Sequence, residues 1–357
     1  MGLFSKTKSL LGVDVGSGSI KLVELKSENK AARLHTYGWI EQRSDVVKVD
    51  SSEQMKITAD AIKKLWSSSH AQGKRCIAAL PSFSVFSYMI NLPFMPDKDI
   101  PAAVKWEAKK VVPMPLEEVT LDWKVVDKGA TPPPQPSKDQ QDKESKSIKV
   151  LLTAAPRNLV QKYINIFAQA GIELLSLETE SFALSRSLIG YEPTVALLLD
   201  LGMTVTDIVV VDNGLPMVSR SIDVGGATLT KAIADAMHVD LKRAEQFKRD
   251  MGFAATTASE GVLKIIQQAF APIVNEIQYS RQTYQEQRQK QILKVVLSGG
   301  TAWLPGLTTY LESVLQLKVL IGDPWARVSY PQELAPVLKE IGPGLAVAIG
   351  LALRDFM

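Results

Sequence analysis

One short stretch, residues 14–21 with the sequence Asp-Val-Gly-Ser-Gly-Ser-Ile-Lys, limits what this chain can fold into. Apolar runs at residues 10–13 and 20–25 flank it, which predicts two strands joined by a tight Gly/Ser turn. Such a turn leaves backbone N–H groups free to face an anion. A carboxylate at Asp14 is tolerated beside phosphate only if a cation lies between them. The stretch therefore predicts either a phosphate-binding hairpin with Mg²⁺ or an ordinary hairpin turn.

The same pattern returns in the second half of the chain. Residues 200–207, Asp-Leu-Gly-Met-Thr-Val-Thr-Asp, lie between two apolar runs, and the second run ends at the turn-forming pair Asn213-Gly214. A late glycine turn, Gly299-Gly300, follows a third strand-like run. The second copy and the glycine pair favour the phosphate interpretation. Together they resemble the actin, Hsp70 and sugar-kinase ATPase superfamily, in which two such hairpins hold the phosphates of a nucleotide from two sides of a cleft.

Composition excludes several other classes of protein. With 357 residues, 46% of them hydrophobic, the chain is long enough for two or more domains. The net charge of +3 comes from scattered Lys and Arg, which gives no support for nucleic-acid binding. The single cysteine, Cys76, excludes an internal disulfide, and three scattered histidines have no zinc-ligand spacing. The longest apolar run, residues 345–353, is half of the ~18 residues that a membrane span needs, so a cytoplasmic protein is expected.

The pattern between residues 82 and 170 differs from that of the flanking chain. It predicts strand, helix, strand, strand and helix, which suits a small sheet covered on one face. Its loop 128–147, rich in Pro, Lys, Asp, Gln and Glu, predicts a disordered insertion, with a Pro-rich ligand segment as the alternative. We therefore expect four parts: 1–81 with about 171–199 and 343–357, the insert 82–170, 200–225 with 289–342, and a helical part 226–288.

Three longer stretches narrow the resemblance to one family. Residues 11–25, 297–307 and 350–354 look like those of PilM, the actin-like type IV pilus assembly family, and the position of the insert resembles PilM and its relative FtsA. The resemblance implies an α/β, actin-like ATPase (ribonuclease H-like) fold of two lobes. It also implies an FtsA-type inserted subdomain, 1C, and no actin-type 1B subdomain.

The resemblance implies ATP and Mg²⁺ as ligands and assigns a role to each matching residue. The residues implied to contact the phosphates are Asp14, Gly16, Ser17, Gly18, Ser19 and Lys21 in the first hairpin, and Asp200, Gly202 and Thr204 in the second. Asp14 and Asp200 are implied to hold Mg²⁺ through water, and Gly299 and Gly300 to flank the adenosine. Glu245 and Lys248 are implied to lie beside ribose and adenine; a surface charge pair at i,i+3 is the alternative.

The residues that would carry hydrolysis are harder to assign. In the superfamily, an acid or amide on the segment that enters the second half positions the water, which makes Glu180, together with Asp200, the candidate and leaves Glu178 as second choice. Either glutamate could instead cap the following helix. Met203 and Val205 stand where strong ATPases have glycines. ATP binding with slow or negligible hydrolysis is therefore expected.

The resemblance also implies a partner, the N-terminal cytoplasmic peptide of the inner-membrane protein PilN, bound between the first subdomain and the insert. Aromatic residues are about twice as dense over residues 82–123 as in the whole chain, which suits either a peptide groove or the core of the insert. Membrane association is then expected through the partner, contact with PilO and other platform proteins indirectly, and a homo-oligomer stays open. The alternatives are an FtsA-like division filament protein and a small-molecule kinase of the same superfamily.

Overall fold

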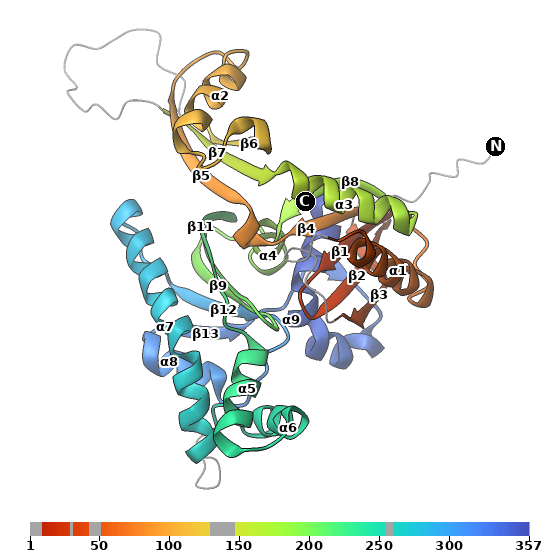
Figure 1. The fold of residues 1–357 in the computed structure, drawn as a ribbon. Helices are drawn as coiled ribbons and strands as arrows, with labels where there is room; N and C mark the ends of the chain where they lie inside the picture. The colour runs from red at the N-terminus through yellow and green to blue at the C-terminus, as the bar shows by residue number, and fades with distance from the viewer. Residues whose placement is uncertain (1–8, 29–30, 43–50, 129–146, 255–259, 357) are drawn as a thin grey trace. The chain divides into compact units, whose positions relative to one another are not determined.

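The computed structural model describes residues 9–28, 31–42, 51–128, 147–254 and 260–356. The chain forms two compact units, one of Met1–Ser82 with Ile164–Met357 and one of Phe83–Tyr163 (Figure 1). Each unit has its own hydrophobic core. Apart from its two ends, the loop 128–147 that the sequence predicts to be disordered lies outside the described residues.

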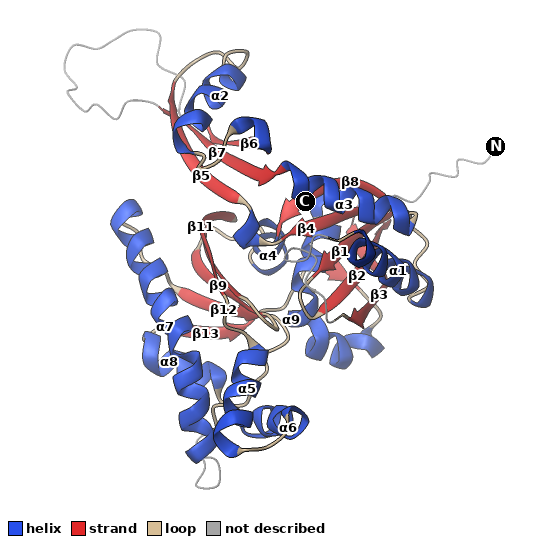
Figure 2. Cartoon of the chain, viewed as in Figure 1, coloured by secondary structure: helices blue, strands red, loops and turns tan. Residues whose placement is uncertain are grey.

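The larger unit contains two sheets of the same plan (Figure 2). The first has the order β14-β3-β2-β1-β4-β8, with β1 (Ser9–Val15), β2 (Ser19–Glu28), β3 (Ala31–Glu41), β4 (Arg75–Leu80), β8 (Glu173–Thr179) and β14 (Val328–Ser329). The second has the order β11-β10-β9-β12-β13, with β9 (Val195–Leu201), β10 (Thr206–Asp212), β11 (Leu215–Ile222), β12 (Lys294–Ser298) and β13 (Lys318–Ile321). In each, three consecutive antiparallel strands join two parallel strands. The repeated Asp-x-Gly motif therefore follows a repeated strand arrangement.

The long helix α9 (Ala335–Ala352) packs against residues of both sheets and against α4 (Glu180–Leu188). Two glycines permit the close approach. A Cβ at Gly12 of β1 would lie 2.0 Å from the carbonyl oxygen of Ala348, and one at Gly350 would lie 1.9 Å from that of Ala183. Neither position has room for a side chain, so β1, α4 and α9 form one tightly packed core.

This closing helix corrects the sequence analysis in two respects. The sequence predicts a closing helix from about Gly344 to Phe356, but the helix begins at Ala335 and continues through Pro343. Within the described residues, Gln332–Ala352 is long and apolar enough to cross a membrane by length and composition, whereas the sequence predicted no such run. Of its most apolar window 56% is buried inside the protein, which fits the core helix of a globular unit.

The other helices of the larger unit flank the two sheets. They are α1 (Ser52–Ser68), α5 (Gly226–Met237), α6 (Leu241–Met251), α7 (Glu260–Arg288) and α8 (Leu307–Leu315). Helix α1 packs on the first sheet, where Leu65 lies against Gly38 of β3. Helix α7 lies against β10 and β11 and contributes Phe270 to a cluster of rings with Phe253 and Tyr310.

The smaller unit is a three-stranded antiparallel sheet with one helix on it. Its strands are β5 (Phe86–Pro93), β6 (Val119–Asp127) and β7 (Ser147–Pro156), in the order β5-β7-β6. Helix α2 (Ile100–Val111) buries Ile100, Val104 and Ala108 in the core of this unit. Helix α3 (Arg157–Ala170) begins in this unit and ends in the larger one. The succession strand, helix, strand, strand, helix is the one that the sequence predicts.

Candidate functional site

The two Asp-x-Gly hairpins are built alike. In the first, Asp14 on β1 lies opposite Lys21 on β2; in the second, Asp200 on β9 lies opposite Asp207 on β10. In each turn the glycine two residues after the first aspartate donates its N–H to a carbonyl across the turn, at 3.1 Å in the first hairpin and 3.0 Å in the second. The hairpins thus present equivalent turns but differ in charge, because a lysine in one is replaced by an aspartate in the other.

The two turns touch within the larger unit. The hydroxyl of Thr204 donates a hydrogen bond of 2.7 Å to the hydroxyl oxygen of Ser17. Beside this contact, a Cβ added to Gly18 would lie 2.4 Å from the sulfur of Met203, a half-exposed side chain. The structure therefore brings together the two turns that the sequence singled out, and the side chain of Met203 lies where any side chain on Gly18 would have to go.

Asp14 and Asp207 are buried at the hairpins, and Asp200 is partly buried. Asp14 is 3% exposed and forms an ion pair of 3.0 Å with Lys21. Burial alone lowers the pKa of Lys21, but the carboxylates of Asp14 and Asp200 outweigh it and raise that pKa above its usual value. Asp200 accepts a hydrogen bond of 2.6 Å from the hydroxyl of Ser298 on β12. Burial nevertheless raises the pKa of Asp200.

Glu180, the first residue of α4, lies in the same cluster. Its Oε2 accepts the backbone N–H of Ser82 at 2.9 Å, and its carboxyl group is hydrogen-bonded to that of Asp207, which also accepts from the hydroxyl of Ser221. Burial raises the pKa of Glu180 well above its usual value, with the charge of Asp207 adding to the effect. Burial likewise raises the pKa of Asp207 to about 7. The two carboxyl groups therefore share a proton near neutral pH.

The cluster has a surplus of negative charge. Four carboxyl groups act on one another electrostatically: those of Asp14, Glu180, Asp200 and Asp207. The ammonium group of Lys21 offsets part of their negative charge. Among the described residues, no three His, Cys, Asp or Glu side chains are placed to ligate a metal ion together. This donor set does not suit a fully protein-coordinated metal, but it fits Mg²⁺ that keeps most of its water ligands.

The predicted glycine pair lies beside the second hairpin. Gly299 has φ +86°, and a Cβ there would lie 2.4 Å from the carbonyl oxygen of Leu201, at the end of β9. A Cβ at Gly300 would meet nothing within 4 Å. The backbone N–H of Thr301 donates a hydrogen bond of 3.3 Å to the same carbonyl of Leu201. The glycine turn is thus fixed to the strand that carries Asp200, with the second glycine facing open space.

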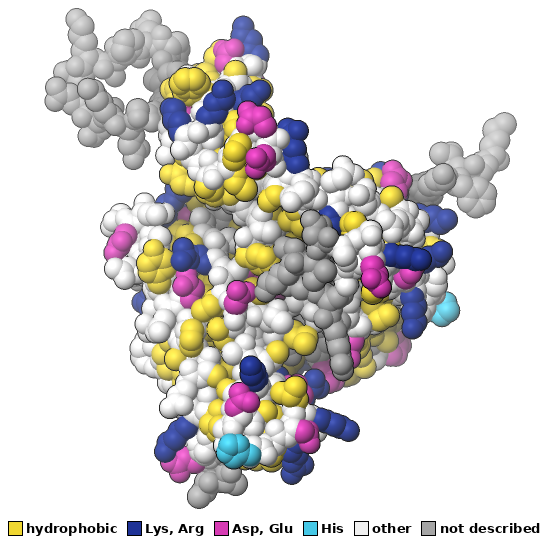
Figure 3. Space-filling model, in the orientation of Figure 1, with side chains coloured by type: hydrophobic (Ala, Val, Ile, Leu, Met, Phe, Trp, Pro, Cys, Tyr) yellow, Lys and Arg dark blue, Asp and Glu magenta, His cyan; other side chains and the backbone are white. Residues whose placement is uncertain are grey.

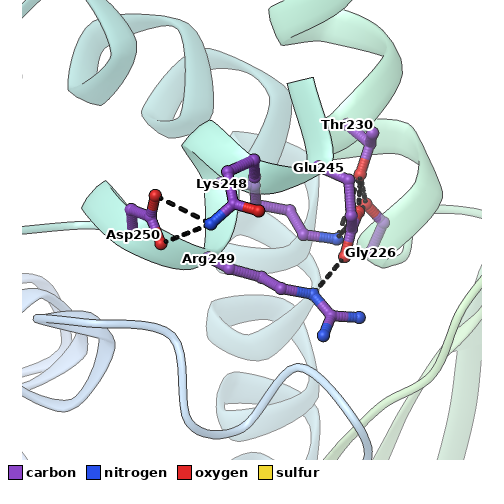
Figure 4. Close-up of polar contacts among 7 residues, drawn as sticks. Gly226, Thr230, Glu245, Lys248, Arg249 and Asp250 are labelled. Atoms are coloured by element: carbon purple, nitrogen blue, oxygen red, sulfur yellow. Dashed lines mark hydrogen bonds and ion pairs between the residues drawn. The ribbon is translucent and has the colours of Figure 1, made fainter. Parts of the chain in front are cut away.

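Glu245 and Lys248 form part of an internal network (Figure 4). Lys248, 7% exposed, donates to the carbonyl of Gly226 at 3.1 Å and to the hydroxyl of Thr230 at 3.0 Å, and pairs with Glu245 at 2.7 Å. Arg249 binds the other oxygen of Glu245 at 2.8 Å. Because a lysine has three N–H donors, this arrangement uses all of them. The pair anchors α6 to the first turn of α5. Glu245 and Lys248 do form an i,i+3 charge pair, the alternative given by the sequence, but Lys248 is buried and bonded to a second helix.

Glu178 is held differently from Glu180. Its two oxygens accept from the guanidinium of Arg186 at 2.8 and 2.9 Å, and Arg186 also donates to the carbonyl of Gly350 on α9. This pair joins β8, α4 and α9. The hairpin carboxylates contribute to the raised pKa of Glu180, the first of the two candidates from the sequence.

Sequence reasoning missed several residues of the cluster. Two serines donate to predicted site carboxylates, Ser82 to Glu180 and Ser298 to Asp200. Asp207 is hydrogen-bonded to Glu180 and accepts from Ser221. None of these four residues was a candidate from the sequence. A signal existed for Asp207, because it ends the second hairpin at the place that Lys21 has in the first. The serines come from three separate segments and carry no such signal.

A comparison of the sequence with models of protein families identifies the family of the chain. The family model for the type IV pilus assembly protein PilM matches residues 12–356. The chain belongs to the PilM family. The predicted family is therefore confirmed, and with it a role in type IV pilus assembly.

Solved structures place the PilM-family chain among actin-like proteins. A structure of the PilM–PilN type IV pilus biogenesis complex matches with 27% identity over 98% of both chains and a TM-score of 0.80. The ethanolamine utilization protein EutJ from Carboxydothermus hydrogenoformans matches at 16% identity over 98% of this chain and 90% of that chain, with a TM-score of 0.55. MreB 5 of Spiroplasma citri, bound to AMPPNP, matches at 14% identity over 97% and 95%, with a TM-score of 0.53. The predicted actin-like ATPase fold is confirmed.

A curated relative supports the same relationship. The cell division protein FtsA of Bacillus subtilis (strain 168) is 26% identical over 267 residues, which are 65% of this chain and 58% of that protein. The match thus spans less than two thirds of the length of FtsA. The similarity agrees with an FtsA-related fold.

Proposed function

We propose that this PilM-family chain is a nucleotide-binding scaffold of the type IV pilus assembly platform, which binds the N-terminal cytoplasmic peptide of a PilN partner. The observation that carries the proposal is the match to the PilM–PilN complex, which covers 98% of both chains at a TM-score of 0.80. At 27% identity this likeness extends beyond the fold. The proposed partner comes from that complex and remains to be tested for this chain.

The smaller unit offers a feature that supports peptide binding. A cavity of about 380 Å³ lies among Leu116, Val119 and Leu121, with Lys105 and Arg157 also lining it. Glu117 and Thr120 complete the lining. A lining that mixes apolar side chains with a few polar and charged groups suits a site for a short apolar peptide with polar contacts. Arg157 is fixed in place because its Nε donates to the carbonyl of Val119 at 3.0 Å.

For the nucleotide, we assign ATP with Mg²⁺ to the two hairpins. The backbone N–H groups and hydroxyls of residues 16–19, with Lys21, would hold phosphate oxygens from one side, and Gly202 and Thr204 from the other. Gly299 and Gly300 would border the adenosine. Asp14 and Asp200 would hold Mg²⁺ through water. The surplus of carboxylates supports a divalent cation here, since it leaves buried negative charge that only protons otherwise neutralise.

We expect turnover at this site to be slow. Glu180 is the proposed catalytic residue, but its carboxyl group already shares a proton with Asp207 and accepts from Ser82, which leaves it less available to take a proton from an attacking water. Met203 adds bulk at the turn where the hairpins meet. Both features support a site that binds ATP and hydrolyses it slowly, with Asp200 acting on the cation.

The remaining assignments follow from the same proposal. The chain would act at the cytoplasmic face of the inner membrane through PilN, would contact PilO and other platform proteins indirectly, and could assemble with itself. The subdomain boundaries at 1–81, 82–170, 200–225 and 226–288, with their returning segments, remain proposals of the same kind.

Titration calorimetry with full-length protein and a synthetic peptide of the N-terminal cytoplasmic segment of PilN from the same organism tests the proposal. We expect saturable one-to-one binding, and no binding of a scrambled peptide of the same composition. Leu121→Glu, which places a charge on the cavity floor, is expected to weaken binding, whereas Leu293→Glu, at a well-exposed leucine of the larger unit, serves as the control. No binding by the folded wild-type protein, with and without Mg·ATP, would reject the proposed partner.

A further inference from the structure

The outer face of α2 carries a basic and aromatic strip. Successive residues of an α-helix are rotated by about 100° around its axis. Because Ile100, Val104 and Ala108 face the core, the residues on the opposite side of α2 face outward. We call the residues on that side the α2 strip: Lys105, Trp106, Lys109 and Lys110. Trp106 is 63% exposed, the highest value among the large hydrophobic side chains of the smaller unit that the structure describes. A tryptophan so exposed between lysines is unusual for a surface in contact only with water.

The charges of the strip are mostly uncompensated. The helix contains one acid, Glu107, which pairs with Lys110 at 2.7 Å, and Lys110 also lies 5.6 Å above the ring of Trp106. Across the ranges that the structure describes, neither Lys105 nor Lys109 has an ion pair or a hydrogen bond from its side chain. Two ammonium groups therefore remain free on the same side as the indole ring.

The space-filling view agrees with this account. Lys and Arg side chains lie among hydrophobic side chains and several Asp or Glu side chains on the part of the smaller unit that carries α2 (Figure 3). A helix seated on a sheet in this way presents a convex outer surface. Peptides are usually bound in a groove or added to the edge of a sheet. Lys105 lines the cavity described above, whereas Trp106, Lys109 and Lys110 do not line it.

We propose that the α2 strip binds an anionic lipid surface. Lysines beside a bilayer are attracted to negatively charged headgroups, and a tryptophan is most stable at the boundary between headgroups and acyl chains. The long apolar stems of the lysines let their ammonium groups reach phosphate oxygens while the indole ring enters the interface. The proposal goes beyond the nucleotide and peptide functions proposed above and depends on neither.

Vesicle sedimentation with the full-length protein tests this. We expect binding to vesicles of phosphatidylglycerol and phosphatidylcholine, little binding to phosphatidylcholine alone, and weaker binding at high salt because screening shortens the range of the attraction. Removing the charges of Lys109 and Lys110 by replacement with glutamine is expected to weaken binding about 25-fold, since each lysine near an anionic surface contributes about fivefold. The matched control replaces Lys63 and Lys64, exposed lysines of α1, with glutamine and is expected to bind like wild type.

A second measurement locates the contact. Brominated lipids quench a tryptophan that enters the bilayer interface, so wild-type fluorescence is expected to fall on binding, and Trp106→Phe is expected to lose that part of the quenching. Binding of the PilN peptide and thermal stabilisation by Mg·ATP, measured on the same variants, report separately on the proposed function and on folding. Both are expected to be unchanged.

Three results would overturn the inference. They are wild-type protein that does not bind anionic vesicles, glutamine variants of α2 that bind as tightly as wild type, and quenching that Trp106→Phe leaves unaltered. If polyglutamate bound at the strip and vesicles did not, the strip would be assigned to an acidic protein and the lipid proposal would be rejected.

Discussion

Replacing Asp207 with asparagine tests the electrostatics of the carboxylate cluster most directly. The carboxyl group of Asp207 shares a proton with Glu180 and accepts from the hydroxyl of Ser221. Asparagine has nearly the same shape; its amide nitrogen can donate to Glu180 and its oxygen can still accept from Ser221. The substitution therefore removes a titrating group while preserving the packing.

The sign and size of the effect follow from the pKa of Asp207. Burial raises that pKa from 3.8 to about 7, so between these values the folded protein binds a proton that the unfolded chain has released. The free energy of unfolding then falls as pH rises through this window. The stabilisation from this proton is complete below pH 3.8 and is lost once pH passes about 7. At about 1.4 kcal/mol per unit, the wild-type protein loses at most about 4 kcal/mol over the window.

Urea-induced unfolding without nucleotide or Mg²⁺, at about pH 5 and about pH 7, measures this loss. Over those two units the wild-type protein is expected to lose about 3 kcal/mol more than Asp207→Asn. Titrating groups that do not interact with Asp207 cancel in the difference, and loss of the Asp207 charge lowers the pKa of Glu180, which changes the difference in the same direction. Asp60→Asn, which removes an exposed carboxylate from α1, controls for the change in net charge. Equal losses in wild type and Asp207→Asn would refute the shared proton.

Three further substitutions test other parts of the molecule. Asp14→Ala is expected to abolish the stabilisation by Mg·ATP, which for wild type amounts to about 2.7 kcal/mol at a hundredfold excess over Kd; an equal thermal shift in the mutant would contradict the phosphate assignment. Gly12→Ala is expected to lower the melting temperature strongly, because its Cβ would lie 2.0 Å from the Ala348 oxygen, at a cost of about 3 kcal/mol. Lys248→Met removes the donor that the Gly226 carbonyl, the Thr230 hydroxyl and Glu245 share, so the single proton of Thr230 must serve either Gly226 or Glu245, and the change is expected to cost about 2 kcal/mol in urea unfolding; a loss near zero would show that the network does not hold α6.

Local turn chemistry explains why the hairpins could be predicted from sequence. Gly16 and Gly202 each close a turn by a backbone hydrogen bond within four residues, so the sequence around each contains everything that the turn needs. The same holds for the order of elements in the smaller unit. The predicted start of α9 at about Gly344 was wrong, because the helix begins at Ala335 and continues through Pro343, a residue type that disfavours a helix interior. Packing of the earlier turns around Leu338 extends the helix beyond what local propensity indicates.

Contacts between distant segments explain what could not be predicted. Glu180 is joined to Ser82 and to Asp207 across long stretches of chain, and no spacing in the sequence specifies these bonds. Lys248 matched a family motif, yet its three donors are used by Gly226, Thr230 and Glu245. A motif predicts which residue types lie near a site, whereas the use of each donor depends on the packing of α5 against α6.

The difference between the two hairpins predicts that a bound cation would stabilise the second hairpin more than the first. Asp14 faces Lys21, so the first hairpin carries a nearly neutral pair across its strands. Asp200 faces Asp207, and two like charges at cross-strand positions repel each other. The protein reduces this repulsion with the hydroxyl of Ser298 on Asp200 and with the proton shared by Asp207. A hydrated cation beside Asp200 would reduce it further, and so any Mg²⁺ bound between the hairpins gains more from the second than from the first.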